Sequence, residues 1–482
     1  MDVHWHRRDL RASDNRALAE ASTDGEGEVL PVFVFDDDVL AHAGPPRVRF
    51  MLDALAALRE DYRERGGDLL VRRGDPREVL PAVADEFGAE RVYWNRDYSG
   101  LARERDEAVR TALSGAGLTP QQFHDAVFHE PGSITTNQGE PYSVYSYFWR
   151  KWRDREKPEP YPEPEAVVDP AGATAVADAD ADPGTLPSIA DLGFDEPEAD
   201  VQPAGTAAAR ERLRTFCEDA VFEYAEGREY PAREGTSRLS TDLKWGTVGL
   251  REVYEATEEA MAEAEAERGE DAVESVEEFR SQLAWREFYA HVLHYNPNVV
   301  TEDYRSYENP IEWVEDEELL RAWKDGETGY PIVDAGMRQL RAEAYMHNRV
   351  RMIVASFLTK DLMLDWRAGY AWFREKLADH DTANDNGGWQ WAASTGTDAQ
   401  PYFRIFNPMT QGERYDPDAE YIRRYVPELE GVPAEQIHDW HELTTLQRRR
   451  TAPEYPEPVV DHSERREAAL AMFERARGED EE

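Results

Sequence analysis

The feature that most constrains the fold is a change of hydrophobic pattern near Gly205. Up to residue 130, short apolar runs alternate with amphipathic stretches of helical spacing. They predict strands at residues 3–5, 29–35, 68–72, 91–94 and 122–124, and helices at 13–20, 48–65, 76–87 and 102–114. This alternation predicts a doubly wound parallel sheet. No G-x-G-x-x-G follows a strand, so dinucleotide binding in the usual mode is not predicted.

The chain is expected to be helical from Gly205 onward, after a connector. Residues 155–205 are rich in Pro, Ala, Asp and Glu, which predicts a surface connector. Beyond it, strand signals vanish and amphipathic helical patterns follow one another. We therefore predict an α/β domain at residues 1–130, a connector at 131–205 and a larger all-α domain at 206–482. Ser13 and Asp75 stand at expected helix N-caps, and Pro76 suits a first helical position.

The charge of the chain restricts its partners. It holds 100 Asp and Glu against 55 Lys and Arg, a formal net charge of −45. Such an acidic coat is typical of a halophilic protein, and it requires any DNA site to be a local basic patch. Cys217 is the single cysteine, which excludes a disulfide and a cysteine metal site within one chain, and we predict no metal. Without a signal peptide or a long apolar run, we expect a cytoplasmic protein that does not enter a membrane.

Two segments of the helical half could bind ligands. Residues 235–240, Gly-Thr-Ser-Arg-Leu-Ser, place hydroxyls and a guanidinium at the head of a helix expected near Thr241. This combination suits a pyrophosphate, and an ordinary serine N-cap is the alternative. Residues 282–289 place an amide, an indole and a guanidinium at helical spacing, which suits a stacked base. A core tryptophan flanked by salt bridges fits that second segment as well.

Two further segments lie between residues 328 and 408, the stretch that we expect to hold the working site. Asn348, Arg349 and Met352 share one face of a predicted helix. Arg351 points elsewhere and needs an acidic partner, for which Asp379 and Asp381 are candidates. Residues 379–391 place polar loop residues and a Gly-Gly turn before a Trp-x-Trp pair, which suits a planar polar ligand beside an aromatic wall. Their spacing does not fit an EF-hand.

Together these segments resemble the DNA photolyase/cryptochrome family over nearly the whole chain. The matching runs are residues 5–15, 142–149, 328–338, 388–397 and 403–408. The resemblance is strongest to the class I members, which repair cyclobutane pyrimidine dimers in UV-damaged DNA. It implies a light-driven carbon–carbon lyase that acts as a monomer with no obligate protein partner.

The resemblance implies FAD, held in a U-shaped form by the helical domain. Reduced and excited by blue light, this cofactor passes one electron to the dimer, which splits and returns it. The positions that match its contacts are Tyr224, Thr236, Ser237, Arg238, Leu239, Ser240, Phe279, Arg286, Arg351, Asp379, His380, Asp381 and Asp385. Phe279 stands where the family usually has Trp, so it keeps an aromatic surface and loses an indole N–H.

The family flips the lesion out of the duplex, which is cheap because the dimer pairs weakly. The positions that match DNA and lesion contacts are Arg228, Gln282, Trp285, Tyr289, Asn348, Arg349, Met352, Trp391, Arg404 and Gln411, with Trp285 and Trp391 as walls of the dimer pocket. Trp389, Trp366 and Trp323 match the relay that carries electrons from the surface to the flavin.

The N-terminal domain of this family binds an antenna pigment. Residues 5–11, Phe35, Asp36, Arg47 and Lys244 resemble the members that bind an 8-hydroxy-5-deazaflavin more than those that bind a folate.

Two positions depart from the commonest repair pattern and keep other functions open. Gln282 stands where many such enzymes have Glu, as in (6-4) photolyases, but Asn348 and Arg349 replace the two histidines of that group. Asp385 aligns with the residue that faces the flavin N5, where repair enzymes have Asn and plant-type cryptochromes have Asp. The alternatives are therefore a cryptochrome-type blue-light photoreceptor, a (6-4) photolyase and, third, a DNA-binding flavoprotein without photochemistry.

Overall fold

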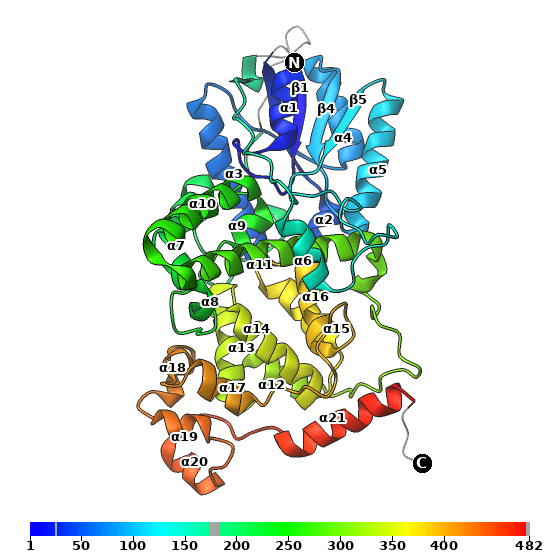
Figure 1. Cartoon of the computed structure of the whole chain (residues 1–482). Coiled ribbons are helices and arrows are strands. Elements are labelled where there is room, and N and C mark those ends of the chain that lie inside the picture. The colour runs from blue at the N-terminus through cyan, green and yellow to red at the C-terminus, as the bar shows by residue number, and fades with distance from the viewer. Residues whose placement is uncertain (25–26, 173–183, 479–482) are drawn as a thin grey trace. The chain divides into compact units, whose positions relative to one another are not determined.

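The computed structural model describes residues 1–24, 27–172 and 184–478, which form two compact units (Figure 1). Unit 1 comprises Met1–Pro197, Val201–Phe222 and Ser237–Pro297, and unit 2 comprises Glu198–Asp200, Glu223–Thr236 and Asn298–Glu482. Part of the predicted connector, residues 173–183, lies outside the described residues. The division into three domains stays a proposal.

Unit 1 contains the predicted parallel sheet, with the strand order β3-β2-β1-β4-β5. The strands are β1 (Asp2–His6), β2 (Glu28–Phe35), β3 (Leu70–Arg73), β4 (Arg91–Asn95) and β5 (Thr119–Phe123). A short strand that we did not predict, β6 (Ala166–Val167), pairs with β2. The strand order reverses between β1 and β4, and the carboxyl ends of the strands at such a point are where open α/β sheets bind ligands.

Helices cover both faces of this sheet. In β2, Val29, Phe33 and Phe35 join one hydrophobic cluster, whereas the alternate residues Leu30, Val32 and Val34 join another. The first cluster includes α1 (Arg16–Asp24) and α3 (Pro45–Glu64), and the second includes α4 (Pro76–Phe87) and α5 (Gly100–Gly115). Because successive strand residues face opposite ways, the apolar run of β2 serves two cores. The predicted fold class is confirmed.

The helix caps were predicted correctly at one of two positions. Asp75 accepts a hydrogen bond from the Arg77 N–H at the start of α4, with Pro76 in the first helical position. Ser13 was wrong as a cap, because α1 begins only at Arg16 and the Asn15 side chain accepts from the Leu18 N–H. Asn is as good an N-cap as Ser, so the spacing alone did not separate them.

The other helices of unit 1 include two that carry predicted site residues. They are α2 (Asp37–Leu40), α6 (Tyr145–Arg153), α7 (Thr206–Glu218), α9 (Ser240–Trp245), α10 (Leu250–Glu263) and α11 (Glu270–Tyr295). A π-helical turn, Ala264–Arg268, precedes α11. The helix α9 confirms the start expected near Thr241, and α6 was not predicted.

The named secondary-structure elements in the described part of unit 2 are all helices, joined by several irregular segments. Its helices are α8 (Tyr224–Gly227), α12 (Glu317–Asp325), α13 (Pro331–Glu343), α14 (Asn348–Ser356), α15 (Trp366–Lys376), α16 (Thr382–Ala393), α17 (Pro408–Tyr415), α18 (Glu420–Tyr425), α19 (Ala434–His438), α20 (Thr445–Thr451) and α21 (His462–Ala476). A π-helical turn, Phe357–Asp361, follows α14 directly. One large core, with Trp323, Trp366, Trp389 and Trp440 in it, holds these helices together.

The Gly-Gly turn predicted at residues 387–388 was wrong, because both glycines lie inside α16. Asp381 caps this helix by accepting from the Ala383 and Asn384 N–H groups. The cap and the buried tryptophan side of the helix outweigh the low helix propensity of two glycines. The residues expected on a loop are therefore fixed on a rigid element.

Among the described residues, no helix is both long and apolar enough to cross a bilayer.

Candidate functional site

The centre of the candidate site in unit 2 is the Arg351 guanidinium on α14. Its Nη2 donates to Asp379 Oδ2 at 2.6 Å, its Nε donates to the Met346 carbonyl at 2.8 Å, and its Nη1 lies 3.7 Å from Asp385 Oδ1. The neighbouring carboxylates raise the pKa of Arg351 against the opposing effect of burial. Asp379 is therefore the acidic partner predicted for Arg351, whereas Asp381 is used as a helix cap.

Polar groups in this cluster are left over after the internal bonds are made. Asp379 Oδ1 is buried and has no hydrogen-bond partner among the described residues, and the same holds for the indole N–H of Trp389. Asp385 Oδ2 lies 2.6 Å from His380 Nδ1, so the second carboxylate is bonded to an imidazole. A buried acceptor without a donor is costly, which indicates a place for a polar ligand.

The three predicted relay tryptophans lie in one core, and each is almost fully buried. The rings of Trp323 and Trp389 are 6.0 Å apart, and the indole N–H of Trp323 donates to the Val354 carbonyl. Helix α15 carries Trp366 and packs on Trp389 at Gly369, where an added Cβ would lie 2.0 Å from the indole. Gly369 is thus needed for the close approach of α15 to Trp389.

A relay from the surface requires an end that meets solvent, and Trp323 is 0% exposed. Trp313 is only partly buried. Its neighbour Val314 donates to the Met363 carbonyl at 2.8 Å and pairs with Leu364, which leads into α15 and Trp366. Trp313, which sequence reasoning did not single out, is thus a less buried tryptophan on a segment that pairs with the chain just before α15. The feature that could have drawn attention to Trp313 is its position in an irregular segment instead of a helix, since irregular segments lie at the surface.

The predicted lesion-facing residues of unit 2 share the start of α14 and its surroundings. The Asn348 amide lies 3.9 Å from Met352 Sδ, one turn along the helix, as the shared face predicted. Arg349 forms an ion pair with Glu229 and lies 4.4 Å over the Tyr415 ring. These contacts hold the guanidinium in place, so binding of a phosphate would have to compete with Glu229.

The other predicted residues of unit 2 are more dispersed. Trp391, on α16, packs 6.4 Å from Phe406. Arg228 lies 5.4 Å over the Tyr224 ring. Arg404 is exposed, and Gln411 lies on α17 with a buried amide oxygen. Thr236 follows Gly235, where a Cβ would collide with the Gly227 backbone at 2.6 Å.

Unit 1 holds the remaining predicted contacts, most of them on α11. Trp285 stacks on Tyr145 of α6, with ring centroids 3.7 Å apart and planes at 12°, and Tyr289 lies 5.5 Å from Trp285. Gln282 donates to Glu278 at 2.8 Å, one turn earlier on the same helix. Phe279 packs against Phe216 at 4.7 Å, so its ring lies in the core.

The Arg286 guanidinium donates to the Ala126 carbonyl at 2.5 Å and to the Leu243 carbonyl at 3.1 Å. These bonds tie α11 to the end of α9, just after the predicted residues Ser237, Arg238, Leu239 and Ser240. Arg238 adopts a left-handed backbone conformation with φ of 51°, which is uncommon for a residue with a side chain. The hydroxyl segment is thus held in a fixed, irregular shape.

The predicted antenna residues lie at the carboxyl edge of the sheet of unit 1. The guanidinium groups of Arg7 and Arg105 both lie over the Trp5 ring, at 4.9 Å and 5.3 Å from its centroid. Asp36, directly after Phe35 of β2, lies 3.4 Å from Arg105. Arg47 on α3 donates to the His42 carbonyl, and the Lys244 ammonium lies 5.7 Å from the Trp245 ring.

His4, His6 and Asp9 form a buried cluster at the same edge, with one possible ligand atom of each within 4.8 Å of the others. Their groups are bonded to one another and to neighbours: His6 Nε2 lies 2.7 Å from the Tyr62 hydroxyl, and Asp9 accepts from Asn95 at 2.6 Å. Burial and the adjacent His6 lower the pKa of His4 to about 4. Most of the possible ligand atoms are thus used in hydrogen bonds within the protein, whereas His4 Nδ1 is buried without a partner among the described residues.

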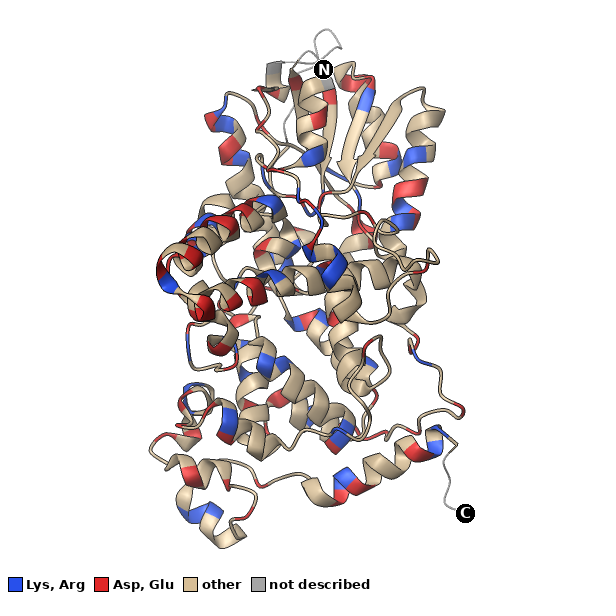
Figure 2. Cartoon of the chain, in the orientation of Figure 1, with Lys and Arg blue, Asp and Glu red and all other residues tan. Residues whose placement is uncertain are grey.

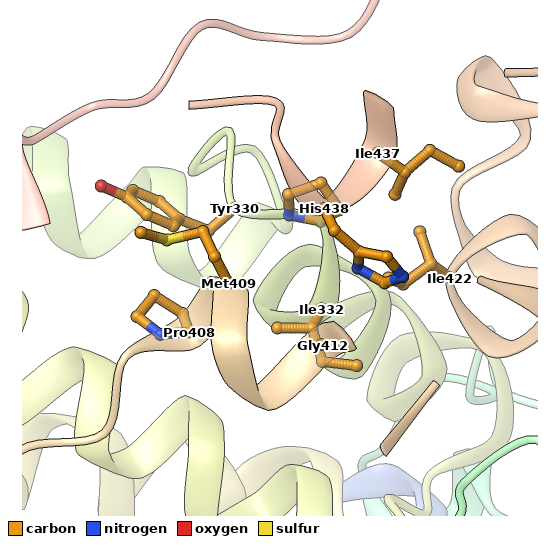
Figure 3. Close-up of a pocket in the computed structure, with 9 residues that line it drawn as sticks. Tyr330, Ile332, Pro408, Met409, Gly412, Ile422, Ile437 and His438 are labelled. Carbon is orange, nitrogen blue, oxygen red and sulfur yellow. The ribbon is translucent and has the colours of Figure 1, made fainter. Parts of the chain in front are cut away.

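A small pocket in unit 2 does not coincide with the predicted site (Figure 3). It is lined by Tyr330, Pro331, Ile332, Pro408, Met409, Gly412, Ile422, Ile437 and His438. The lining is mostly apolar, and His438 Nε2 is bonded to the Pro417 carbonyl. None of the predicted cofactor or DNA residues lines this pocket, although Gly412 follows Gln411 directly.

Comparison with known proteins covers both halves of the chain. Residues 2–165 match the DNA photolyase domain, and residues 279–475 match the FAD binding domain of DNA photolyase. The deoxyribodipyrimidine photo-lyase of Halobacterium salinarum is 66% identical over 100% of both chains. That of Synechococcus is 41% identical, over 98% of this chain and 96% of the relative.

Solved structures agree over almost the full length. A class III photolyase from Agrobacterium tumefaciens has a TM-score of 0.89 at 36% identity, covering 99% of this chain and 98% of that one. An archaeal photolyase from Sulfolobus tokodaii with two FAD molecules has a TM-score of 0.83 at 31% identity, covering 98% and 100%. A Synechocystis cryptochrome has a TM-score of 0.86 at 26% identity, covering 98% and 99%.

The chain belongs to the DNA photolyase family. The relatives confirm the predicted enzyme class, deoxyribodipyrimidine photo-lyase, and support the predicted FAD-binding domain. The Halobacterium relative fits the halophilic character expected from the acidic composition.

Proposed function

We propose that this protein repairs cyclobutane pyrimidine dimers in DNA with light absorbed by a bound, reduced FAD. The observation that carries the proposal is the full-length match, at 66% identity, to a deoxyribodipyrimidine photo-lyase. The FAD-binding match over residues 279–475 includes both α11 and the Arg351 cluster.

The residues of the Arg351 cluster fit a flavin. The polar edge of an isoalloxazine ring presents both N–H donors and carbonyl acceptors. Asp379 Oδ1 is a buried acceptor that lacks a donor, and Arg351 supplies guanidinium N–H groups beside it. Asp379, Asp385 and His380 would hold that edge, and Tyr224 and Thr236 of the same unit would hold another part of the cofactor.

When bound and reduced, FAD supplies the light-excited electron that splits the dimer. The chain's own residues position it and exclude water. Arg351 offers a fixed positive charge in a buried setting, where it acts more strongly than in water. Trp389 would pass electrons inward, with Trp366 and either Trp323 or Trp313 outside it.

A specific observation favours cyclobutane dimers over (6-4) products. The face at the start of α14 presents Asn348 and Arg349, neither of which can act as a proton donor in the way that a histidine does. The neighbouring His347 is buried, and its ring accepts from the Arg349 N–H as the helix cap. The face therefore suits hydrogen bonding and charge contacts to a dimer.

The photoreceptor alternative depends on Asp385. Its carboxylate lies between Arg351 and His380, so the cluster already holds a cation and an imidazole next to it. These partners offset the repulsion that a carboxylate would exert on a reduced, anionic flavin. We therefore favour the enzyme, with Asp385 tuning the cofactor.

We further propose an antenna of the 8-hydroxy-5-deazaflavin type at the carboxyl edge of the sheet, and a protein that acts as a cytoplasmic monomer. The charged pair Asp36 and Arg105 beside Trp5 supports a polar, aromatic pigment there. Mass spectrometry of the released chromophores would identify the antenna, and light scattering in high salt would give the mass in solution.

The function is tested by incubating reduced protein with dimer-containing DNA, with and without blue light. We expect dimers to disappear only in the light, while DNA carrying (6-4) products stays unchanged. Photoreduction of the flavin without loss of dimers would support the photoreceptor instead. Repair of (6-4) products would support the (6-4) photolyase alternative.

A further inference from the structure

Helix α6 has a composition that its place in the fold does not explain. Its nine residues, Tyr-Ser-Tyr-Phe-Trp-Arg-Lys-Trp-Arg, include three cations and no acid, in a chain with 100 acidic and 55 basic residues. Figure 2 shows this helix as a blue segment of unit 1. None of its residues was predicted to contact DNA.

One face of α6 is fully used for packing within unit 1. Tyr145, Phe148 and Trp152 are buried at helical spacing. Tyr145 stacks on Trp285, and its hydroxyl donates to the Ser281 carbonyl at 2.6 Å. Phe148 packs on Phe288 at 5.4 Å. The helix is therefore fixed on α11, directly behind Trp285, which we expect to touch the lesion.

The other face of α6 is exposed and carries positive charge. Arg150 and Lys151 are exposed and form no ion pair with a carboxylate among the described residues. Arg153, by contrast, is paired with Asp154 and Glu277. Arg150 lies 4.7 Å over the ring of Tyr147, which is itself 53% exposed. A guanidinium supported by an exposed ring and an adjacent ammonium remain available to an anionic partner.

We propose that α6 is a DNA-contacting surface, in which Arg150 and Lys151 bind backbone phosphates next to the lesion; this inference rests on the proposed function. An acidic protein repels DNA except at a local basic patch, and Arg150 and Lys151 form such a patch. The groups that they would bind on DNA are the backbone phosphates. An exposed ring beside an arginine is also typical of nucleic-acid surfaces. Fixation of α6 behind Trp285 would place these two charges at a constant distance from the lesion contact.

The test compares the variant Arg150→Gln/Lys151→Gln with the variant Arg449→Gln/Arg450→Gln. The second pair is exposed on α20, also without carboxylate partners among the described residues, and both variants remove two positive charges. Binding of the full-length protein to a labelled duplex, with or without one thymine dimer, is measured by fluorescence anisotropy over a series of KCl concentrations.

Two lost phosphate contacts should lower the slope of log affinity against log salt by about 2. At about 0.2 M salt, affinity for both duplexes should fall by a similar factor of about ten or more, because phosphate contacts carry no preference for the lesion. The α20 variant should keep the wild-type slope. Arg150→Lys/Lys151→Arg, which keeps both charges, should keep it too.

An unchanged slope in the α6 variant, or an equal loss in the α20 variant, would overturn the inference. The unfolding temperature of each variant shows whether a change of slope comes from misfolding. If the α6 variant loses both its slope and its fold, the result supports the inference only when the charge-keeping variant retains the wild-type slope and the wild-type fold. If the wild type failed to repair dimers in light while the slopes still differed, the proposed function would fall and the DNA contact would stand.

Discussion

Two buried clusters of arginine and aspartate can be compared, one in each unit. In unit 1, Arg11 and Arg251 face Asp14 and Asp125. Every carboxylate oxygen there has a donor: Asp14 accepts from the backbone N–H groups of Arg251, Glu252 and Tyr161, and Asp125 from that of Arg16. In unit 2, Arg351 faces Asp379 and Asp385, and Asp379 Oδ1 has no donor among the described residues.

The difference teaches how to separate a structural charge cluster from a binding one. Both clusters are buried and both balance charge, so burial and ion pairing alone would rank them equally. Only the cluster in unit 2 has a buried acceptor left over, which is expensive unless a ligand supplies the donor. Asp379 is also the residue that the family resemblance assigns to FAD.

The largest effect on stability should come from breaking the cluster in unit 1, in which every carboxylate oxygen has a donor. Arg251→Met leaves Asp14 and Asp125 with one cation, and loss of one partner from a buried pair costs about 3–5 kcal/mol. We expect the free energy of unfolding of the flavin-free protein to fall by that amount at constant salt. A loss below about 1 kcal/mol would mean that the cluster in unit 1 is not structural.

A further buried carboxyl sharpens the comparison, because Glu287 in unit 1 is held mainly by backbone donors and lies 3.9 Å from the His291 imidazole. It accepts from the Phe128 and His129 N–H groups, at 2.7 Å and 3.0 Å. Burial raises the pKa of Glu287 to about 7, although these bonds oppose the shift. Its contribution to stability is therefore fully present below about pH 4.5 and is lost as pH rises through about 7.

Glu287→Gln keeps one of the two acceptor oxygens and cannot ionise. The stability advantage of the wild type over this variant should shrink by up to about 3 kcal/mol between pH 4.5 and 8. Unfolding curves of both proteins across this range provide the measurement. A difference that stays flat with pH would show that Glu287 does not titrate in this way.

A substitution in the cluster of unit 2, where Asp379 Oδ1 lacks a donor among the described residues, should affect FAD binding more than stability. Asp379→Asn removes the charged acceptor while Asp385 still faces Arg351, so the dissociation constant of FAD should rise about tenfold to a hundredfold. Asp14→Asn in unit 1 is the matched control: it should lower stability and leave the flavin affinity of the folded protein unchanged. Equal flavin loss in both variants would remove the distinction between the clusters.

The smallest predicted effect is the difference between Trp313→Phe and Trp323→Phe, which shows which of the two tryptophans is the outer end of the relay. As a reference, Trp389→Phe should abolish photoreduction of oxidised FAD and leave repair by pre-reduced protein largely intact. Trp313→Phe should then slow photoreduction more than Trp323→Phe, because Trp313 is the less buried of the two. Absorbance changes under blue light with an external reductant measure both. A stronger effect of Trp323→Phe would restore the predicted relay.

Pattern and resemblance predicted much of this molecule, for reasons that can be named. The parallel sheet followed from hydrophobic period, and the Arg351–Asp379 pair followed from the need of a buried arginine for an acid. Helix α6 and the helical Gly387–Gly388 were missed because tertiary packing and a cap outweighed local propensity. The burial of Trp323 could not be predicted, since spacing does not show which indole reaches solvent.

The most direct test measures bound flavin and dimer repair in the same samples of wild type and Asp379→Asn. With both proteins reduced and illuminated over a range of added FAD, the repair rate should be proportional to bound flavin and fall on one line. The variant would only need more FAD to reach each point. Repair without bound flavin, or a flavin-saturated wild type that leaves dimers intact, would contradict the account.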